Sequence, residues 1–250
     1  KPTRAHLMRR SGKGVPAAIE LDHHFSFHHA NAYEEGNNLV VLDTLAYTGF
    51  EGGVGFLDPN PSPPGGPDNY ARVDYETVPK SNLVRYTIDL TTYKYTKQVL
   101  CDRFCEFPTI NPSCHGGKHR YVWALCSNKR DGKSAATQAL CMVDTEDTSK
   151  STIWVPDAHV FCGEPMFVAK GGGGVAEDDG YILVLLYDGK KDASELAVFD
   201  ASDIEKGPIT RLKLRTAVPH GLHGTWVEGL VPSLEEIQRS EKGATFLGEH

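Results

Sequence analysis

Three segments of this chain end in the same way and recur at a nearly constant interval. Ile88-Asp89, Val143-Asp144 and Phe199-Asp200 each close a run rich in β-branched and aromatic residues, and each is followed by a short turn and a second such run. The three aspartates lie 55 and 56 positions apart. Several short strands repeated at this period are typical of β-propeller blades, because a single four-stranded blade cannot bury both of its faces and must stack on neighbours. A β-sandwich with two coincidentally similar intervals is the alternative.

Most of the remaining sequence also has the pattern of short strands separated by turns. Val, Ile, Leu, Thr and Tyr fill the runs, and Gly, Pro, Asp and Asn separate them, so we predict an all-β fold. One helix is predicted at residues 233–242, where Ser233 would be the N-cap and Glu236 has the capping-box position. Residues 58–69 are predicted to form a surface loop, and the glycines at 171–174 a flexible turn. The predicted strands cover residues 38–47, 83–89, 93–100, 120–126, 139–144, 152–156, 180–187, 195–200 and 209–215.

The composition argues against several classes of protein. Charged residues make up 24% of the chain, and the formal net charge of -7 gives no basic footprint for nucleic acid. The sequence has no signal-peptide pattern and no apolar run of about 18 residues, so we expect no membrane-spanning segment. None of the six cysteines forms a CxxC pair, and we expect free thiols in a reducing compartment. Cys101, Cys105 and the adjacent pair Cys114-His115 do not have the spacing of a usual zinc motif.

Four polar residues in apolar surroundings share the period of the strands. Glu106 and Glu164 lie 58 positions apart, and Glu164 and His223 lie 59 apart. His28 precedes Glu106 by 78 positions, and that interval contains a Pro/Gly-rich loop of roughly 20 residues, without which the same period returns. In a propeller, the start of each innermost strand lines the central channel. Two imidazoles and two carboxylates would therefore meet near one axis, which is the composition of a metal site.

The two residue types suggest different tasks at such a site. Neutral imidazole is a good ligand for Fe(II), and a carboxylate that accepts the other ring N–H fixes the tautomer of the imidazole. A lone histidine in a β-protein is more often a surface or hydrogen-bonded core residue, and only the shared period distinguishes His28 and His223. His29 would point away from His28 if this stretch is a strand. We also interpret the following as surface or hydrogen-bonded core histidines: His23, His24, His115, His119, His159 and His220.

These four segments resemble the motifs of the carotenoid cleavage oxygenases, a family that includes carotenoid cleavers, stilbene cleavers and a retinoid isomerase. The motifs are FHHANAYEE, CEFPTINP, GEPMFV and PHGLHGTW, which occur in the family's order and spacing within residues 20–228. The resemblance implies a seven-bladed propeller, of which residues 1–250 would form about the last four blades, with residues 229–250 as a C-terminal tail. It also implies an iron held by four histidines, three of which are held by glutamates.

By motif, the resemblance makes His28 and His223 iron ligands, with Glu106 as the partner of His28 and Glu164 as the partner of His223. No catalytic residue is expected beyond the iron site. The first two ligand histidines and one glutamate of the family's site have no counterpart here. The chain also begins at Lys1 rather than at a methionine. We therefore expect a gene product about twice this length, or an inactive fragment.

The implied activity is Fe(II)-dependent dioxygenase chemistry, in which O₂ splits a conjugated C=C bond of a carotenoid or apocarotenoid into two carbonyl products. Stilbene cleavage, retinoid-type isomerisation and a non-catalytic binding scaffold are the alternatives. Because polyenes dissolve in bilayers, peripheral association with a membrane surface is expected. We expect an intracellular location, in the cytoplasm or a plastid.

Overall fold

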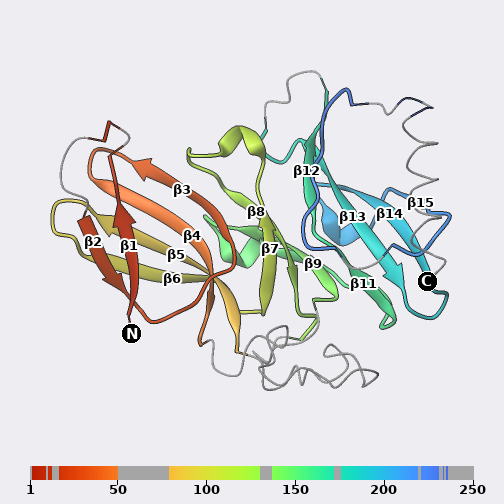
Figure 1. The fold of residues 1–250 in the computed structure, drawn as a ribbon, viewed down its shortest axis with the longest axis horizontal. Helices are drawn as coiled ribbons and strands as arrows, with labels where there is room; N and C mark the ends of the chain where they lie inside the picture. The colour runs from red at the N-terminus through yellow and green to blue at the C-terminus, as the bar shows by residue number, and fades with distance from the viewer. Residues whose placement is uncertain are drawn as a thin grey trace.

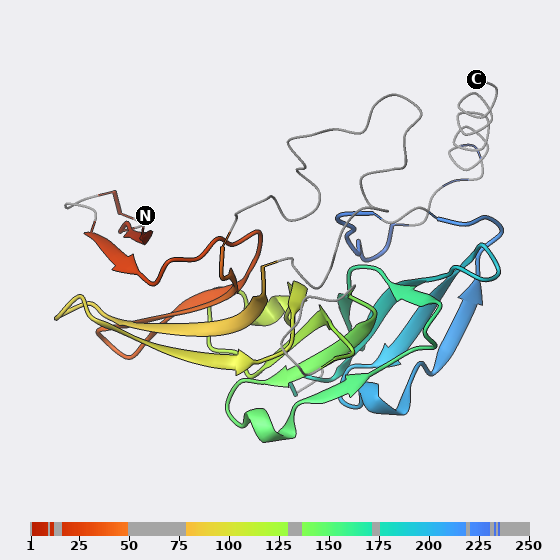
Figure 2. The ribbon, with the colours of Figure 1, turned by 90° about the horizontal axis from the view of Figure 1, so that it is seen from below.

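The computed structural model of this chain describes residues 2–9, 11, 12, 17–49, 79–129, 137–171, 176–218, 221–230, 233 and 235. Three antiparallel sheets follow one another along the chain and fan out side by side, as Figures 1 and 2 show. The first two sheets are meanders in which consecutive strands pair, and in the third two short strands share the innermost place, so each sheet has the form of a propeller blade. Among the described residues, no helix combines the length and the apolar character needed to cross a membrane.

The three blades contain most of the strands. The first blade comprises β3 (His29–Glu35), β4 (Leu39–Tyr47), β5 (Ser81–Asp89) and β6 (Tyr95–Cys101). The second comprises β7 (Cys105–Thr109), β8 (Tyr121–Cys126), β9 (Ala139–Asp144) and β10 (Thr152–Trp154). The third comprises β11 (Val160–Cys162) and β12 (Met166–Ala169), which both pair with β13 (Gly180–Asp188), then β14 (Ala193–Asp200) and β15 (Thr210–Lys213).

A two-stranded sheet precedes the first blade. It pairs β1 (Thr3–Leu7) with β2 (Ala17–Leu21) and packs its apolar side against the first blade. Together with the three complete blades it accounts for the roughly four blades expected from the repeat. The fold is thus all-β, and its short 3₁₀ helices span Pro112–Cys114, Thr148–Lys150 and Ile204–Lys206.

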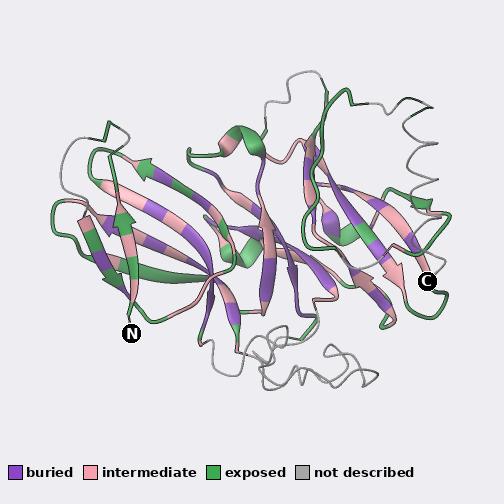
Figure 3. Cartoon of the chain, in the orientation of Figure 1, coloured by how far each residue is buried: buried purple, intermediate pink, exposed green. Residues whose placement is uncertain are grey.

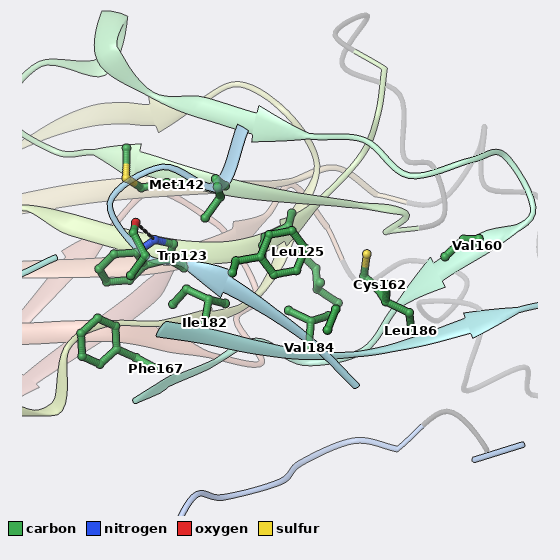
Figure 4. Close-up of a cluster of buried hydrophobic side chains, with 14 residues drawn as sticks. Trp123, Leu125, Met142, Val160, Cys162, Phe167, Ile182, Val184 and Leu186 are labelled. Atoms are coloured by element: carbon green, nitrogen blue, oxygen red, sulfur yellow. Dashed lines mark hydrogen bonds between the residues drawn. The ribbon is translucent and has the colours of Figure 1, made fainter. Parts of the chain in front are cut away.

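The hydrophobic core lies between blades rather than inside any one of them. Trp123 of the second blade packs with Phe167 and Ile182 of the third, and Figure 4 shows these side chains interleaved between the two sheets. A second cluster joins the first and second blades through Leu45, Leu83 and their neighbours. The second blade is covered on both faces, and its central strands β8 and β9 are buried along nearly their whole length (Figure 3).

The repeated aspartates occupy equivalent places, as the sequence indicates. Asp89, Asp144 and Asp200 each end the third strand of a blade. Each carboxylate accepts hydrogen bonds from backbone N–H groups two or three residues later, which closes the turn to the fourth strand. These bonds contribute to a lowered pKa at all three carboxyls.

The nine predicted strands are all present, with ends shifted by at most a few residues. Six strands were not predicted, namely β1, β2, β3, β7, β11 and β12. The predicted surface loop at 58–69 lies outside the described residues, as do nearly all of the predicted helix at 233–242 and positions 172–174 of the predicted glycine turn.

Candidate metal centre

The four residues singled out by their period occupy the inner edge of successive blades. His28 immediately precedes β3, and Glu106 lies in β7. Glu164 lies between β11 and β12, and His223 lies in the segment 221–230 that follows β15. The structure brings all four side chains together, although they come from positions up to 195 residues apart. Their role as metal ligands and ligand partners stays a prediction.

Each histidine is paired with the glutamate that the motifs assign to it. His28 Nδ1 lies 2.6 Å from Glu106 Oε2, and His223 Nδ1 lies 2.9 Å from Glu164 Oε1. The Nε2 atoms of the two rings face each other at 3.2 Å. Both imidazoles therefore present the same nitrogen to one point, and both are anchored through the opposite nitrogen.

The hydrogen bonds determine what the two Nε2 atoms present to that point. A carboxylate accepts hydrogen bonds, so Nδ1 carries the proton in both rings, and Nε2 of each neutral imidazole carries a lone pair. Two lone pairs facing each other at 3.2 Å repel unless a proton or a metal ion lies between them. Metal–nitrogen bonds of about 2.0–2.1 Å would place two ligand nitrogens at a right angle about 3 Å apart. The observed spacing therefore fits two ligands of one metal ion.

Phe107 holds the His28 side of the site together. Its backbone N–H donates to Glu106 Oε2 at 2.9 Å, so this oxygen is shared between Phe107 and His28. Its ring lies 5.1 Å from that of His28 and 5.7 Å from that of His223. Phe107 adopts a φ of 53°, within a register shift of the β7–β8 pairing. The sequence analysis missed this residue, although the neighbouring Pro108 inside a strand is a signal of such a bulge.

The Glu106 carboxylate is buried beneath the site. Its side chain is 8% exposed, and its Oε1 atom makes no hydrogen bond within the described structure. Burial and the adjacent Glu106 charge both raise the pKa of Tyr47, which stays protonated. A buried carboxylate is costly without a compensating positive charge. Glu106 thus favours a cation close to it.

The Glu164 and His223 side of the site is more open. Glu164 Oε2 accepts the backbone N–H of Gly224 at 2.7 Å, which ties the segment 221–230 to the third blade. The His223 side chain is 57% exposed. A predominantly apolar pocket adjoins it, lined by residues that include Glu164, Met166, Leu185, Tyr187, Val218, Leu222 and His223.

Several other histidines have partners away from the metal pair. His29 Nδ1 bonds the Thr44 hydroxyl at 2.8 Å and so points away from the metal pair, as expected. His119 is fully buried, with Nε2 2.9 Å from Asp43 Oδ2 and Nδ1 3.1 Å from the Asn31 amide. His24 bonds the Asp22 carbonyl. His220 lies outside the described residues.

The chain resembles known proteins along most of its length. Residues 1–228 match the family described as "Retinal pigment epithelial membrane protein". The chain is 36% identical over 228 residues to apocarotenoid-15,15'-oxygenase of Synechocystis, covering 91% of this chain and 43% of that protein. It is 29% identical to a carotenoid cleavage oxygenase of Mycobacterium tuberculosis, covering 90% of this chain and 42% of that protein.

Solved structures of relatives share the fold. Cobalt-substituted Synechocystis apocarotenoid oxygenase matches with a TM-score of 0.78 at 35% identity, covering 91% of this chain and 44% of that structure. A mutant of the same oxygenase gives a TM-score of 0.80 with the same coverage. These relatives are seven-bladed propellers, so the sheets described above are blades of that propeller type. The chain spans less than half the length of these relatives, and it belongs to the carotenoid cleavage oxygenase family.

Proposed function

We propose that this chain contributes two of the ligands of a non-haem Fe(II) centre, in a dioxygenase that splits a conjugated C=C bond of a carotenoid or apocarotenoid with O₂. The observation that carries the proposal is the pair of Nε2 atoms 3.2 Å apart, each on an imidazole whose other nitrogen is held by a glutamate. The names of the relatives, carotenoid and apocarotenoid oxygenases, support the substrate class.

The donor set suits ferrous iron. Imidazole binds Fe(II) well, and a charged hydrogen-bond partner increases its basicity. His28 and His223 would hold the ion, while Glu106 and Glu164 fix the tautomers and offset its positive charge. When bound, Fe(II) supplies the means to activate O₂ for reaction with a double bond. The residues described here would keep two coordination positions fixed, and Phe107 would shield them from water on one side.

The pocket next to His223 supports an apolar substrate. Met166, Leu185 and Leu222 line it together with Gly163 and Gly224. The segment 221–230 exposes apolar side chains at Leu222, which lines the pocket, and at Trp226, Val227 and Leu230. An apolar surface at the entrance to a polyene site is suited to contact with a membrane. We therefore also propose peripheral membrane association of an intracellular protein, in the cytoplasm or a plastid.

The test measures iron in the full protein that contains these residues, after anaerobic loading with Fe(II) and removal of excess metal. We expect about one iron per protein in the unmodified form, and we expect His28→Ala and His223→Ala each to lose it. The matched control is His29→Ala, which removes a neighbouring imidazole that bonds Thr44 and should leave the iron content unchanged.

Activity is measured on the same samples with an apocarotenal, by loss of polyene absorbance and by mass spectrometry of the aldehyde products formed under ¹⁸O₂. Oxygen-18 in the products, lost with His28→Ala but not with His29→Ala, supports the proposal. A stilbene is supplied in parallel, and its cleavage in place of the apocarotenal would indicate the alternative substrate class. Iron that remains stoichiometric in both His28→Ala and His223→Ala would refute the proposed centre.

A further inference from the structure

One buried side chain packs between the two chain segments that carry His28 and Glu106. Tyr47 ends β4 and is 3% exposed. Its backbone N–H and C=O both pair with Phe25, at 2.8 and 3.1 Å, in an isolated bridge three residues before His28. The sequence analysis did not single out Tyr47, because it lies in a predicted strand and outside the four motifs.

The ring of Tyr47 contacts both segments. It packs edge-on against Phe27, which directly precedes His28, with the ring centroids 5.5 Å apart. It also packs edge-on against Phe104, two residues before Glu106, with the centroids 5.9 Å apart. The ring therefore fixes the spacing of the two segments whose side chains meet at 2.6 Å.

Two buried oxygens beside Tyr47 have no hydrogen-bond partner in the described part of the chain. One is Oε1 of Glu106, whose other oxygen lies within hydrogen-bond distance of His28 Nδ1 and the Phe107 N–H. The other is Oγ of Ser81, which lies opposite Tyr47 in the pairing of β4 and β5. A buried polar atom without a partner is costly, so both oxygens require a neighbouring polar group.

The hydroxyl of Tyr47 suits both oxygens. A tyrosine hydroxyl donates one hydrogen bond and can also accept one. Burial raises the pKa of Tyr47 most, the charge and hydrogen bonding of Glu106 raise it further, and hydrogen bonding with Ser81 lowers it. These directions correspond to a hydroxyl that donates to the carboxylate and accepts from the serine.

We propose that Tyr47 is a positioning residue of the metal centre, whose hydroxyl donates to Glu106 Oε1 and thereby fixes the carboxylate that holds His28. Ser81, Tyr47, Glu106 and His28 then form one chain of hydrogen bonds. This chain ends at the imidazole whose Nε2 is presented to the metal. The inference rests on the proposed iron centre and adds a residue from β4 to it.

The experiment is a titration of the full protein with Co(II), whose d–d absorption reports metal binding. Tyr47→Phe keeps the ring and removes the hydroxyl, and we expect it to weaken binding about 10-fold. Ser81→Ala, which acts through Tyr47, should weaken binding about 3-fold. The matched control is Tyr86→Phe, which removes another buried hydroxyl of the first blade, close to His24, and should leave the affinity unchanged.

A double-variant cycle shows whether Tyr47 acts through Glu106. If it does, Tyr47→Phe should weaken binding less than about 2-fold in a protein that already carries Glu106→Gln. In a protein that carries Glu164→Gln instead, the loss should again be about 10-fold, because that glutamate holds the other histidine. A general loosening of the fold by Tyr47→Phe would weaken binding equally in all three proteins.

Circular dichroism checks that each variant folds, and Ser81→Ala provides the same cycle if Tyr47→Phe does not fold. Two results would overturn this inference while leaving the proposed centre intact. The first is an unchanged affinity in both Tyr47→Phe and Ser81→Ala, and the second is an equal loss with and without Glu106→Gln. Co(II) binding that is unaffected by His28→Ala would instead refute the proposed centre, and this inference with it.

Discussion

The ring of Phe107 packs against that of His28 at 5.1 Å, while the backbone N–H of Phe107 and Nδ1 of His28 share one oxygen of Glu106. In this arrangement the backbone of Phe107 has a φ of 53°. A non-glycine residue in this region costs about 1–2 kcal/mol. The backbone of β7 is thus strained at Phe107, and this residue orients both the Glu106 carboxylate and the His28 imidazole.

The strain at Phe107 predicts an unusual order of stability between two variants. Phe107→Gly and Phe107→Ala both remove the ring, but glycine adopts positive φ without penalty. We expect the glycine variant to be about 0.5–1 kcal/mol more stable than the alanine variant, the reverse of the order usual within strands. Urea unfolding of the two proteins measures the difference. An alanine variant at least as stable as the glycine variant would show that the backbone at 107 is unstrained.

Trp123 allows a test of how firmly the second and third blades are joined. Its indole Nε1 donates to the Ala201 carbonyl at 3.1 Å, and the side chain is fully buried (Figure 4). Trp123→Phe keeps an aromatic ring but leaves this carbonyl without its donor and leaves a small cavity. We expect a loss of about 2–4 kcal/mol in the free energy of unfolding. Denaturant unfolding measures it, and a loss below about 0.5 kcal/mol would contradict an essential contact between the blades.

Within the three blades, the sequence predicts the central and outer strands and overlooks the inner ones. Strands such as β5 and β9 contain mainly β-branched and apolar residues, because neighbouring blades bury them. The inner strand β3 directly follows His28, and β7 contains Glu106 and Pro108, so their sequences do not have the apolar pattern of a strand. In these inner strands the residues needed for the site have low strand propensity, and pairing with the neighbouring strand determines the structure.

The sequence predicts the four residues of the candidate site whose spacing follows the period of the blades. A common period places His28, Glu106, Glu164 and His223 at equivalent blade positions, and the structure brings them together. Phe107 was not predictable in the same way, since its contribution depends on a bulge and a positive φ. Contacts between blades, such as Cys141 beside Cys101, were also out of reach because no sequence spacing reports the stacking of two sheets.

Asp43 should make the fold sensitive to acid. Its carboxylate is fully buried and receives two hydrogen bonds from the Arg85 guanidinium, at 2.8 and 2.7 Å. Burial acts to raise the pKa of Asp43, but Arg85 and His119 outweigh it and hold the pKa below its usual value. The ionised carboxylate therefore stabilises the fold above the unfolded pKa of about 3.9. That stabilisation is lost as the pH falls from about 4 through the lower folded pKa.

The corresponding variant is Asp43→Asn, which leaves the Arg85 charge buried without its partner. We expect a loss of about 3–5 kcal/mol at pH 7, and a smaller difference from the unmodified protein below pH 4. Glu20→Gln is the control, because it breaks an exposed ion pair with Arg4 and should change stability by less than about 1 kcal/mol. Urea unfolding at both pH values measures these effects. If Asp43→Asn lowers the free energy of unfolding equally at both pH values, the charge of Asp43 does not contribute to stability.

The two glutamates of the metal centre should differ in importance. Glu106 is 8% exposed and Glu164 is 23% exposed, so water screens the Glu106–His28 bond less. Substitution by glutamine keeps the size of the side chain and removes its charge. We expect Glu106→Gln to weaken metal binding by about 100-fold and Glu164→Gln by about 10-fold. Titration with Co(II), whose d–d absorption reports the ligands, measures both affinities on the full protein.

The control for the glutamate pair is Glu35→Gln, at the far end of β3, where the carboxylate contacts only exposed Lys118 among the described ion pairs. It should leave the metal affinity unchanged. Urea unfolding of the metal-free proteins shows whether a weaker metal affinity comes from a less stable fold. Because Glu106→Gln removes a buried charge, we expect this variant without metal to be at least as stable as the unmodified protein. If Glu164→Gln weakens binding more than Glu106→Gln, the exposed histidine is the dominant ligand. The depth of the carboxylate would then not determine how strongly its histidine binds the metal.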